Sequence, residues 1–171
     1  MTGWPRPSIL PVESLLQTYC AQGAYTDCFT LEVPHQVSQA QFVAAFYTSP
    51  LFKVERVLLE WVLGKTSSDK LAIEMSLGSD ADFSAWRVEA RNDQQLLLCD
   101  FQGATRSWLM TLPVSTGEGE GTRLFFGSAV VATSSKSGKR AMPLSFRLLL
   151  GFHQLYAKAL LSAAARNGLV G

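Results

Sequence analysis

The spacing of hydrophobic and polar positions changes period several times along the chain, and the order of these changes predicts the fold. Period-two alternation predicts a strand over 24–33, and helical spacing predicts two consecutive helices over 38–47 and 50–63. Strand-like segments then fill 71–132, and a long apolar helix is expected over 143–166. This order predicts an α+β fold in which a curved antiparallel sheet wraps around the C-terminal helix.

The expected sheet is a meander of neighbouring strands. Its segments alternate with period two and are separated by short polar turns, at 71–77, 83–91, 95–101, 105–114 and 122–133. Short turns at close spacing are typical of antiparallel strands rather than of parallel strands joined by helices. In the second segment, Trp86, Val88 and Ala90 alternate with charged residues and are expected to share one face.

The chain is predicted to form one domain preceded by an arm. Pro5, Pro7 and Pro11 make the first residues unsuited to a helix or a strand, and a short helix is expected within 12–20, ended by Gly23. A length of 171 residues fits a single domain. We therefore divide the chain into an N-terminal arm, 1–23, and one domain, 24–171.

The predicted C-terminal helix is more apolar than a single buried stripe requires. Its inward arc is expected to carry Ser145, Leu149, Phe152, Tyr156, Ala159, Leu160 and Ala163. Leu150 and Leu161 fall on the opposite arc. Either the N-terminal arm or a second copy of the chain must cover these leucines, so a homodimer through Leu150 and Leu161 is one prediction.

Composition narrows the range of partners. Fifteen basic and fourteen acidic side chains give a net charge of +1, so neither nucleic acid nor an anionic membrane surface is expected to bind. The apolar stretches are too short for stable membrane insertion, and the first ten residues do not resemble a signal peptide. Three cysteines (Cys20, Cys28 and Cys99) match no zinc-binding spacing. We expect a cytoplasmic protein with free thiols, no metal site and no cofactor.

The element order over about 24–166 resembles the helix-grip superfamily, which includes START lipid-binding domains, polyketide cyclases and plant pathogenesis-related allergens. Three stretches, 25–29, 99–109 and 150–153, are similar to a bacterial branch of that superfamily. The resemblance implies a helix-grip fold with an apolar cavity between the sheet and the C-terminal helix. It implies no catalytic residues, because the superfamily has no shared catalytic motif that matches these positions.

Asp100 and Arg106 flank the predicted turn at 102–103 and are expected to lie opposite each other on neighbouring strands. Arg106 also alternates with Trp108 and Met110, which would turn it toward the concave side of the sheet. A buried arginine needs a carboxylate or an anionic ligand. The sequence leaves two roles open for Arg106, a structural ion pair with Asp100 and the orientation of a ligand.

The ligand-binding set predicted from these patterns comprises Trp86, Asp100, Arg106, Trp108, Phe152 and Tyr156. The aromatic rings suit a flat or acyl ligand, and the Tyr156 hydroxyl offers a polar contact. The sequence therefore predicts a protein that binds a small hydrophobic or amphipathic molecule. One alternative is a cyclase-type or hydrolase-type enzyme with His153, Tyr156 or Asp100 as weak candidates for proton transfer. Another is a non-catalytic structural protein whose cavity is filled.

Overall fold

The computed structural model describes residues 3–53, 68–78, 86–116, 119–131 and 144–167, with side chains of the last helix described from Gln154 onward. Its helices are α1 (Gln17–Ala21), α2 (Gln39–Tyr47), α4 (Asp69–Ser76) and α5 (Leu144–Arg166). Its strands are β1 (Arg6–Pro7), β2 (Tyr25–Val33), β3 (Trp86–Asn92), β4 (Gln95–Asp100), β5 (Thr105–Thr116) and β6 (Gly119–Val130). The α+β class and the long C-terminal helix are as predicted.

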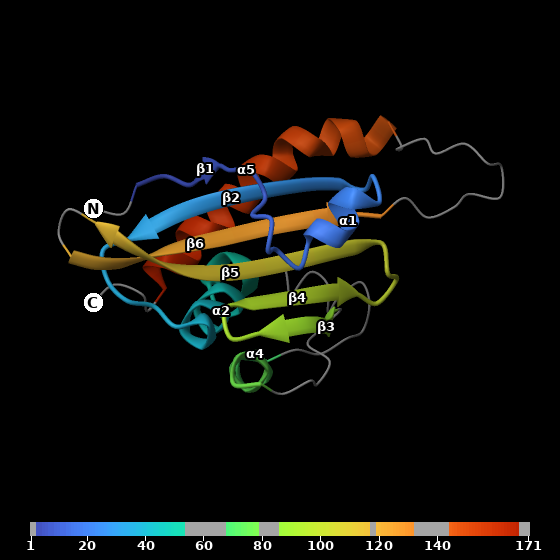
Figure 1. Ribbon diagram of the computed structural model, residues 1–171. Helices are drawn as coiled ribbons and strands as arrows, with labels where there is room; N and C mark the ends of the chain where they lie inside the picture. Colours follow the sequence, from blue (N-terminus) through green and yellow to red (C-terminus); the bar gives the residue numbers. More distant parts are fainter. Residues whose placement is uncertain (1–2, 54–67, 79–85, 117–118, 132–143, 168–171) are drawn as a thin grey trace.

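All six strands form one antiparallel sheet in the order β1-β2-β6-β5-β4-β3 (Figure 1). Strands β3 to β6 follow one another as the predicted meander. The longest hairpin joins β5 to β6, with Thr105 opposite Val130 at one end and Thr116 opposite Gly119 at the other. The early strand β2 lies beside β6, the last strand, so the chain's first long strand is held in the sheet by its final one.

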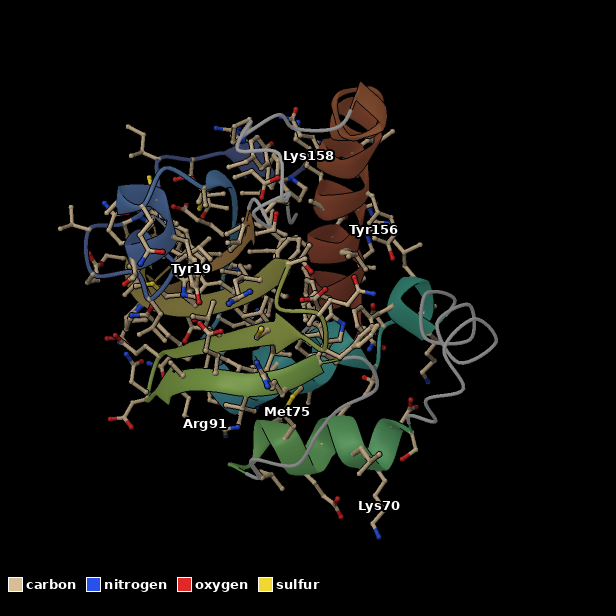
Figure 2. The ribbon with its side chains drawn as sticks, turned by 90° about the vertical axis from the view of Figure 1, so that its right-hand side faces the viewer. Tyr19, Lys70, Met75, Arg91, Tyr156 and Lys158 are labelled. Carbon is tan, nitrogen blue, oxygen red and sulfur yellow. The ribbon has the colours of Figure 1, made fainter. Side chains whose placement is uncertain are left out.

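The two faces of the sheet have different coverings, visible in Figure 1 as helices behind the sheet and the arm with α1 in front. On the face we call the helix face, α2 and α5 pack on strand residues that include Phe29, Leu98, Leu109, Leu124 and Phe126, and α4 packs against α2. On the opposite face, which we call the arm face, residues 10–19 cover a second cluster that includes Leu97, Trp108, Met110 and Phe125. Figure 2 shows Tyr19 and Tyr156 on opposite sides of the sheet.

Helix α2 begins at the N-cap residue Ser38. The Ser38 hydroxyl accepts from the Gln41 backbone N–H, and the Gln41 side chain accepts from the Ser38 N–H, which completes a capping box. A second helical segment starts after Ser49, whose Oγ accepts from the Phe52 N–H at 3.3 Å. The predicted helix over 50–63 is confirmed for residues 50–53, and its remainder lies outside the described residues.

The prediction of a strand at 71–77 is wrong, because this segment belongs to helix α4. Ser68 caps the helix by accepting from the Leu71 N–H, and Asp69 places a negative charge in its first turn. Ala72 and Met75, three residues apart, are the buried positions. Short apolar runs fit both periods, and here the cap and the three-residue spacing decide for the helix.

A β-bulge overturns the predicted alternation in β3. Val88 pairs with Leu98 and Ala90 with Leu97, so Glu89 is the extra residue. Ala90 therefore packs in the arm-face cluster instead of sharing a face with Trp86 and Val88. The bulge also turns Arg91 to the helix face, where its Nη1 donates to the Met75 carbonyl of α4 at 3.1 Å (Figure 2).

Helix α5 buries a slightly different stripe from the predicted one. Its fully buried apolar residues follow helical spacing on the helix face: Ala157, Leu160, Leu161, Ala164 and Ala165. Tyr156, Ala159 and Ala163 are half-buried. The placement of Leu161 on an exposed arc is wrong, since its exposed fraction is 0%. The predicted positions 145–152, Leu150 among them, lie outside the described side chains.

The N-terminal arm joins the sheet as an edge strand. Arg6 and Pro7 pair with Thr30 and Phe29 of β2, and Ser8 N donates to the Cys28 carbonyl at 2.9 Å. The short helix is confirmed at Gln17–Ala21, and Gly23 follows it with a positive φ of 78°. Among the described helices, none is both long and apolar enough to cross a bilayer.

Candidate functional site

A cavity of about 200 Å³ lies between the helix face of the sheet, the end of α2 with the turn after it, and α5. Five aromatic residues contribute to its wall: Phe46, Phe52, Trp86, Phe126 and Tyr156. Three hydroxyl residues and five others complete it: Thr105, Ser107, Ser128, Arg106, Ala129, Val130, Ala157 and Leu160. The sheet and two helices thus meet around one mainly apolar space, the kind of site that holds small ligands.

Two hydroxyl groups of the cavity wall are held by neighbours. The Ser107 and Tyr47 hydroxyls hydrogen-bond to each other at 3.0 Å, and Tyr47 is fully buried. Ser128 Oγ donates to Asp27 Oδ1 at 2.7 Å, and the Ser128 backbone N–H donates to the same oxygen at 3.0 Å. These bonds fix the polar groups at the sheet side of the cavity.

Trp86, at the start of β3, is a further residue of the cavity wall. Its Nε1 atom is buried and has no hydrogen-bond partner among the described residues. A buried donor without a partner costs about 1–3 kcal/mol. By contrast, Trp108, the other tryptophan of the described sheet, donates its N–H to Gln95.

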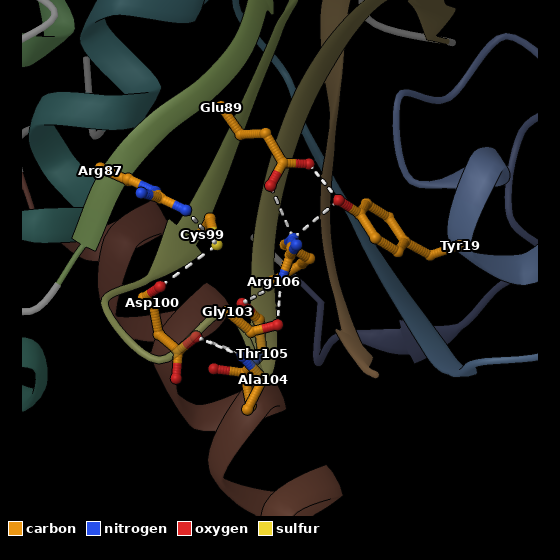
Figure 3. A network of polar contacts seen from close by, with 9 residues as sticks. All are labelled: Tyr19, Arg87, Glu89, Cys99, Asp100, Gly103, Ala104, Thr105 and Arg106. Atoms are coloured by element: carbon orange, nitrogen blue, oxygen red, sulfur yellow. Dashed lines mark hydrogen bonds and ion pairs between the residues drawn. The ribbon is translucent and has the colours of Figure 1, made fainter. Parts of the chain in front are cut away.

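Arg106, which contributes to the cavity wall, holds its guanidinium on the arm face (Figure 3). Its Nε atom lies 2.8 Å from Glu89 Oε2 and 2.9 Å from the Tyr19 hydroxyl, and Nη1 donates to the Gly103 carbonyl at 2.8 Å. The Tyr19 hydroxyl also donates to Glu89, and its ring lies under the guanidinium. The network ties α1 to β3 and β5, so the structural role predicted for Arg106 is present.

The predicted partner of Arg106 is wrong, since Glu89 takes the place of Asp100. Residue Arg106 pairs in register with Cys99, and the Asp100 side chain belongs to the opposite face. Asp100 Oδ1 instead accepts from the Ala104 and Thr105 backbone N–H groups at 2.7 and 3.1 Å. The carboxylate thereby closes the β4–β5 turn, in which Gly103 has a φ of +70°.

Trp108 lies on the arm face and not at the cavity. It is fully buried, and its Nε1 donates to Gln95 Oε1 at 2.9 Å. The same Gln95 oxygen accepts from the Leu15 N–H at 2.9 Å, and Gln95 Nε2 donates to the Glu13 carbonyl at 3.1 Å. Trp108 is thus part of the hydrogen-bond network that holds the N-terminal arm on the sheet.

Desolvation raises the pKa values of three groups on the arm face. Burial and, secondly, the Asp27 carboxylate raise the pKa of the Cys28 thiol to about 12, and burial raises the pKa of Cys99. Both thiols are therefore protonated at neutral pH and unsuited to nucleophilic attack. Burial also raises the pKa of Tyr19, with a further contribution from its hydrogen bond to Glu89. Within the described residues, no group of three His, Cys, Asp or Glu side chains could hold a metal ion.

Of the six residues predicted to bind a ligand, the structure brings Trp86 and Tyr156 together with their side chains at the cavity. Arg106 reaches its wall but directs the guanidinium elsewhere, and Asp100 and Trp108 do not line it. The side chains of Phe152 and His153 lie outside the described residues. Sequence reasoning missed Phe46, Phe52, Ser107, Ser128, Ala157 and Leu160. For Ser107 a signal existed, since it alternates with Leu109 along β5.

A second hollow, an open groove of about 620 Å³, lies at the far end of the sheet. Its wall is mostly polar and includes Gln36, Gln39, Gln94, Ser115 and Glu120. Although this groove is larger, its wall contains no aromatic ring and no cation among the described residues. The smaller apolar cavity is therefore the better candidate for a ligand site.

Comparison of the chain with protein-family models finds no match, and comparison with curated proteins finds no significant similarity.

Proposed function

We propose that the protein binds a small apolar or amphipathic molecule in the cavity between the sheet and α5. The observation that carries the proposal is an aromatic-walled space of about 200 Å³ between the sheet, the end of α2 and α5. An apolar cavity of about 150 Å³ can bind benzene, so this one suits a ligand of one substituted ring or a short acyl chain.

We also propose that the fold is a helix grip. The pairing of β2 with the final strand β6 supports this proposal, as does the packing of α5 across β2 and β6 on the helix face. Helices also follow β2, as the resemblance implies, although the described residues contain three helical segments there, α2, residues 50–53 and α4. A helix-grip fold would explain why the cavity lies under the C-terminal helix.

Titration with ethylbenzene, followed by NMR shifts of cavity residues, tests the binding proposal. We expect saturable binding at one site in the wild-type protein. Ala157 is buried in the cavity wall, so the leucine of Ala157→Leu would occupy ligand space and weaken binding roughly tenfold or more. The control is Ala21→Leu, an exposed position in α1, which should bind like the wild type.

Thermal melting of each variant shows whether a loss of ligand binding is caused by a loss of folding. Ala157→Val, which adds a smaller side chain, is used if Ala157→Leu does not fold. The proposal is contradicted if ethylbenzene shows no saturable binding to the wild type, or if folded Ala157→Leu binds with unchanged affinity. Native mass spectrometry of the purified protein, followed by denaturation, would then identify the class of any molecule that co-purifies in the cavity.

A further inference from the structure

We infer that a separate site at the β1 edge of the sheet binds a small molecule that joins a planar ring to a phosphate group, such as a nucleoside monophosphate. The site is a groove of about 470 Å³, which we call the edge groove. Its wall includes Trp4 and Arg6 of the arm, Thr30 and Glu32 of β2, and Arg123 of β6. None of residues 10–19 contributes to this wall, so the edge groove is distinct from the packed part of the arm face.

The register of the sheet places the edge groove on the opposite side from the cavity. Arg6 pairs with Thr30, and Thr30 pairs with Phe125 of the arm-face cluster. Glu32 and Arg123 form the pair two residues further along the same strands, so their side chains lie on the same side as those of Thr30 and Phe125. A ligand in the edge groove would therefore bind independently of a ligand in the cavity.

An exposed aromatic ring in the edge groove is the first feature that indicates a ligand. Trp4 has an exposed fraction of 52%, whereas Trp108 on the same side of the sheet is fully buried. The face of an exposed indole offers a surface on which a planar ring can stack, and such stacking buries apolar area on both partners. Trp4 therefore favours a ligand with a planar ring.

Two guanidinium groups supply the positive charge that a phosphate requires. Arg6 is exposed, and its side chain has no partner among the described residues. The Nε and Nη2 atoms of Arg123 both donate to Glu32 Oε1, at 2.9 and 2.6 Å, and Nη1 has no partner in the described part of the chain. The described wall thus has two cations and one carboxylate, and arginine N–H groups match phosphate oxygens in pairs.

The backbone of the arm holds Trp4 and Arg6 in a defined relation. Each of them precedes a proline, Pro5 or Pro7, which fixes its own φ and favours an extended conformation in the residue before it. Pro5 is buried, and Arg6 and Pro7 pair with β2 at the edge of the sheet (Figure 1). Because this backbone is already ordered, one ligand can contact the ring and the cation at little cost in chain entropy.

Three probes separate the contribution of the ring from that of the phosphate: adenosine monophosphate, adenosine and inorganic phosphate. We expect the monophosphate to bind the wild-type protein at one site, roughly tenfold more tightly than either of the other two. The indole N–H resonance of Trp4, identified by its loss in Trp4→Ala, should shift with the monophosphate and with adenosine. Calorimetric titration gives the affinities.

Variants of the two arm residues should have different effects. Arg6→Gln should weaken binding of the monophosphate roughly tenfold and leave that of adenosine unchanged, whereas Trp4→Ala should weaken both. The matched control is Arg166→Gln, which removes an exposed arginine at the end of α5 and should leave both affinities unchanged. All three positions are exposed, so the variants should melt within a few degrees of the wild type.

The inference is overturned if the monophosphate shows no saturable binding to the wild type, or if adenosine or phosphate alone binds as tightly. It is also overturned if Arg6→Gln weakens binding of the monophosphate no more than Arg166→Gln does. Titration of the same variants with ethylbenzene reports on the cavity on the other side of the sheet. Failure of the edge groove to bind therefore leaves the proposed function standing, and loss of ethylbenzene binding leaves this inference standing.

Discussion

The two faces of the sheet differ in how completely the segments that cover them fill the space and satisfy the buried polar groups. On the arm face, the polar groups beneath the N-terminal segment have partners: Gln95 joins Trp108 to the backbone of residues 13–15, and Arg106 joins Tyr19 to Glu89. On the helix face, the aromatic residues under α5 leave a cavity, and the Trp86 donor has no partner among the described residues.

We therefore expect the two faces to have different roles, with the arm face stabilising the fold and the helix face binding a ligand. A tightly packed face with satisfied polar groups stabilises the fold, whereas a cavity lowers stability unless a ligand fills it. The two tryptophans of the described sheet show this contrast. Trp86 lies on the helix face and Trp108 on the arm face, and within the described residues only the Trp108 N–H is hydrogen-bonded. Variants on the arm face should therefore change stability, and variants at the cavity should change ligand binding.

The largest effect is expected from Arg106→Met. This variant leaves Glu89 and Tyr19 without their cation at a pair whose side chains are only 11% and 29% exposed, and we expect a loss of about 2–4 kcal/mol in the free energy of unfolding. The matched control is Arg123→Met, whose pair with Glu32 is 42% and 50% exposed and should cost at most about 1 kcal/mol. Urea denaturation of both variants measures the difference, and equal losses would contradict the structural role of Arg106.

Gly127→Ala should overpack the arm face. A Cβ atom at Gly127 would lie 2.8 Å from the Asp27 carbonyl oxygen and 2.9 Å from Cε3 of Trp108, so we expect a loss of about 1–3 kcal/mol. Gly3→Ala provides the control, because no heavy atom lies within 4 Å of its added Cβ. An unchanged midpoint of urea denaturation for Gly127→Ala would mean that this face is looser than described.

Replacing each tryptophan by phenylalanine compares the faces directly. Trp108→Phe removes the donor to Gln95 and part of a fully buried ring, and should lower the free energy of unfolding by about 1–3 kcal/mol. Trp86→Phe removes a donor that has no partner, so its effect should stay within about 1 kcal/mol of the wild type. A reversed order of the two losses, measured without ligand, would refute the comparison.

The smallest effect is expected from Tyr19→Phe, which removes one hydroxyl from the Arg106 network and should cost about 1 kcal/mol at neutral pH. Because the folded state raises the pKa of Tyr19 above 10.0, this residue's contribution is complete below pH 10 and is lost as the pH rises through the folded-state pKa. The stability gap between wild type and variant should therefore narrow above pH 10. A gap that widens in that range would contradict the raised pKa.

Much of the fold could be predicted because its signals are local. The capping box of Ser38 and Gln41, the alternation along β5, and the apolar repeat of α5 all depend on residues close in sequence. Helix α4 was missed because a short apolar run fits both periods, although Ser68 and Asp69 carried a helix-start signal. The bulge at Glu89 has no equivalent local signal.

The candidate site was less predictable, because alternation tells which residues share a face but not which face meets the helix. Arg106 and Trp108 were correctly grouped together, but on the wrong side of the sheet for a ligand. The partner of Arg106 was missed for a related reason: Glu89 lies on β3, two strands away across Cys99, and the bulge is centred on it. Ser107 and Leu160 meet at the cavity only through the tertiary fold.

The most direct test of the two-face account is a crystal structure of the protein under xenon pressure, since xenon occupies apolar cavities. We expect one xenon atom in the cavity among Phe46, Phe126 and Leu160, and none on the arm face around Trp108. Occupancy should disappear in Ala157→Leu. Xenon beneath the N-terminal arm, or its absence from the cavity of the wild-type protein, would contradict the account.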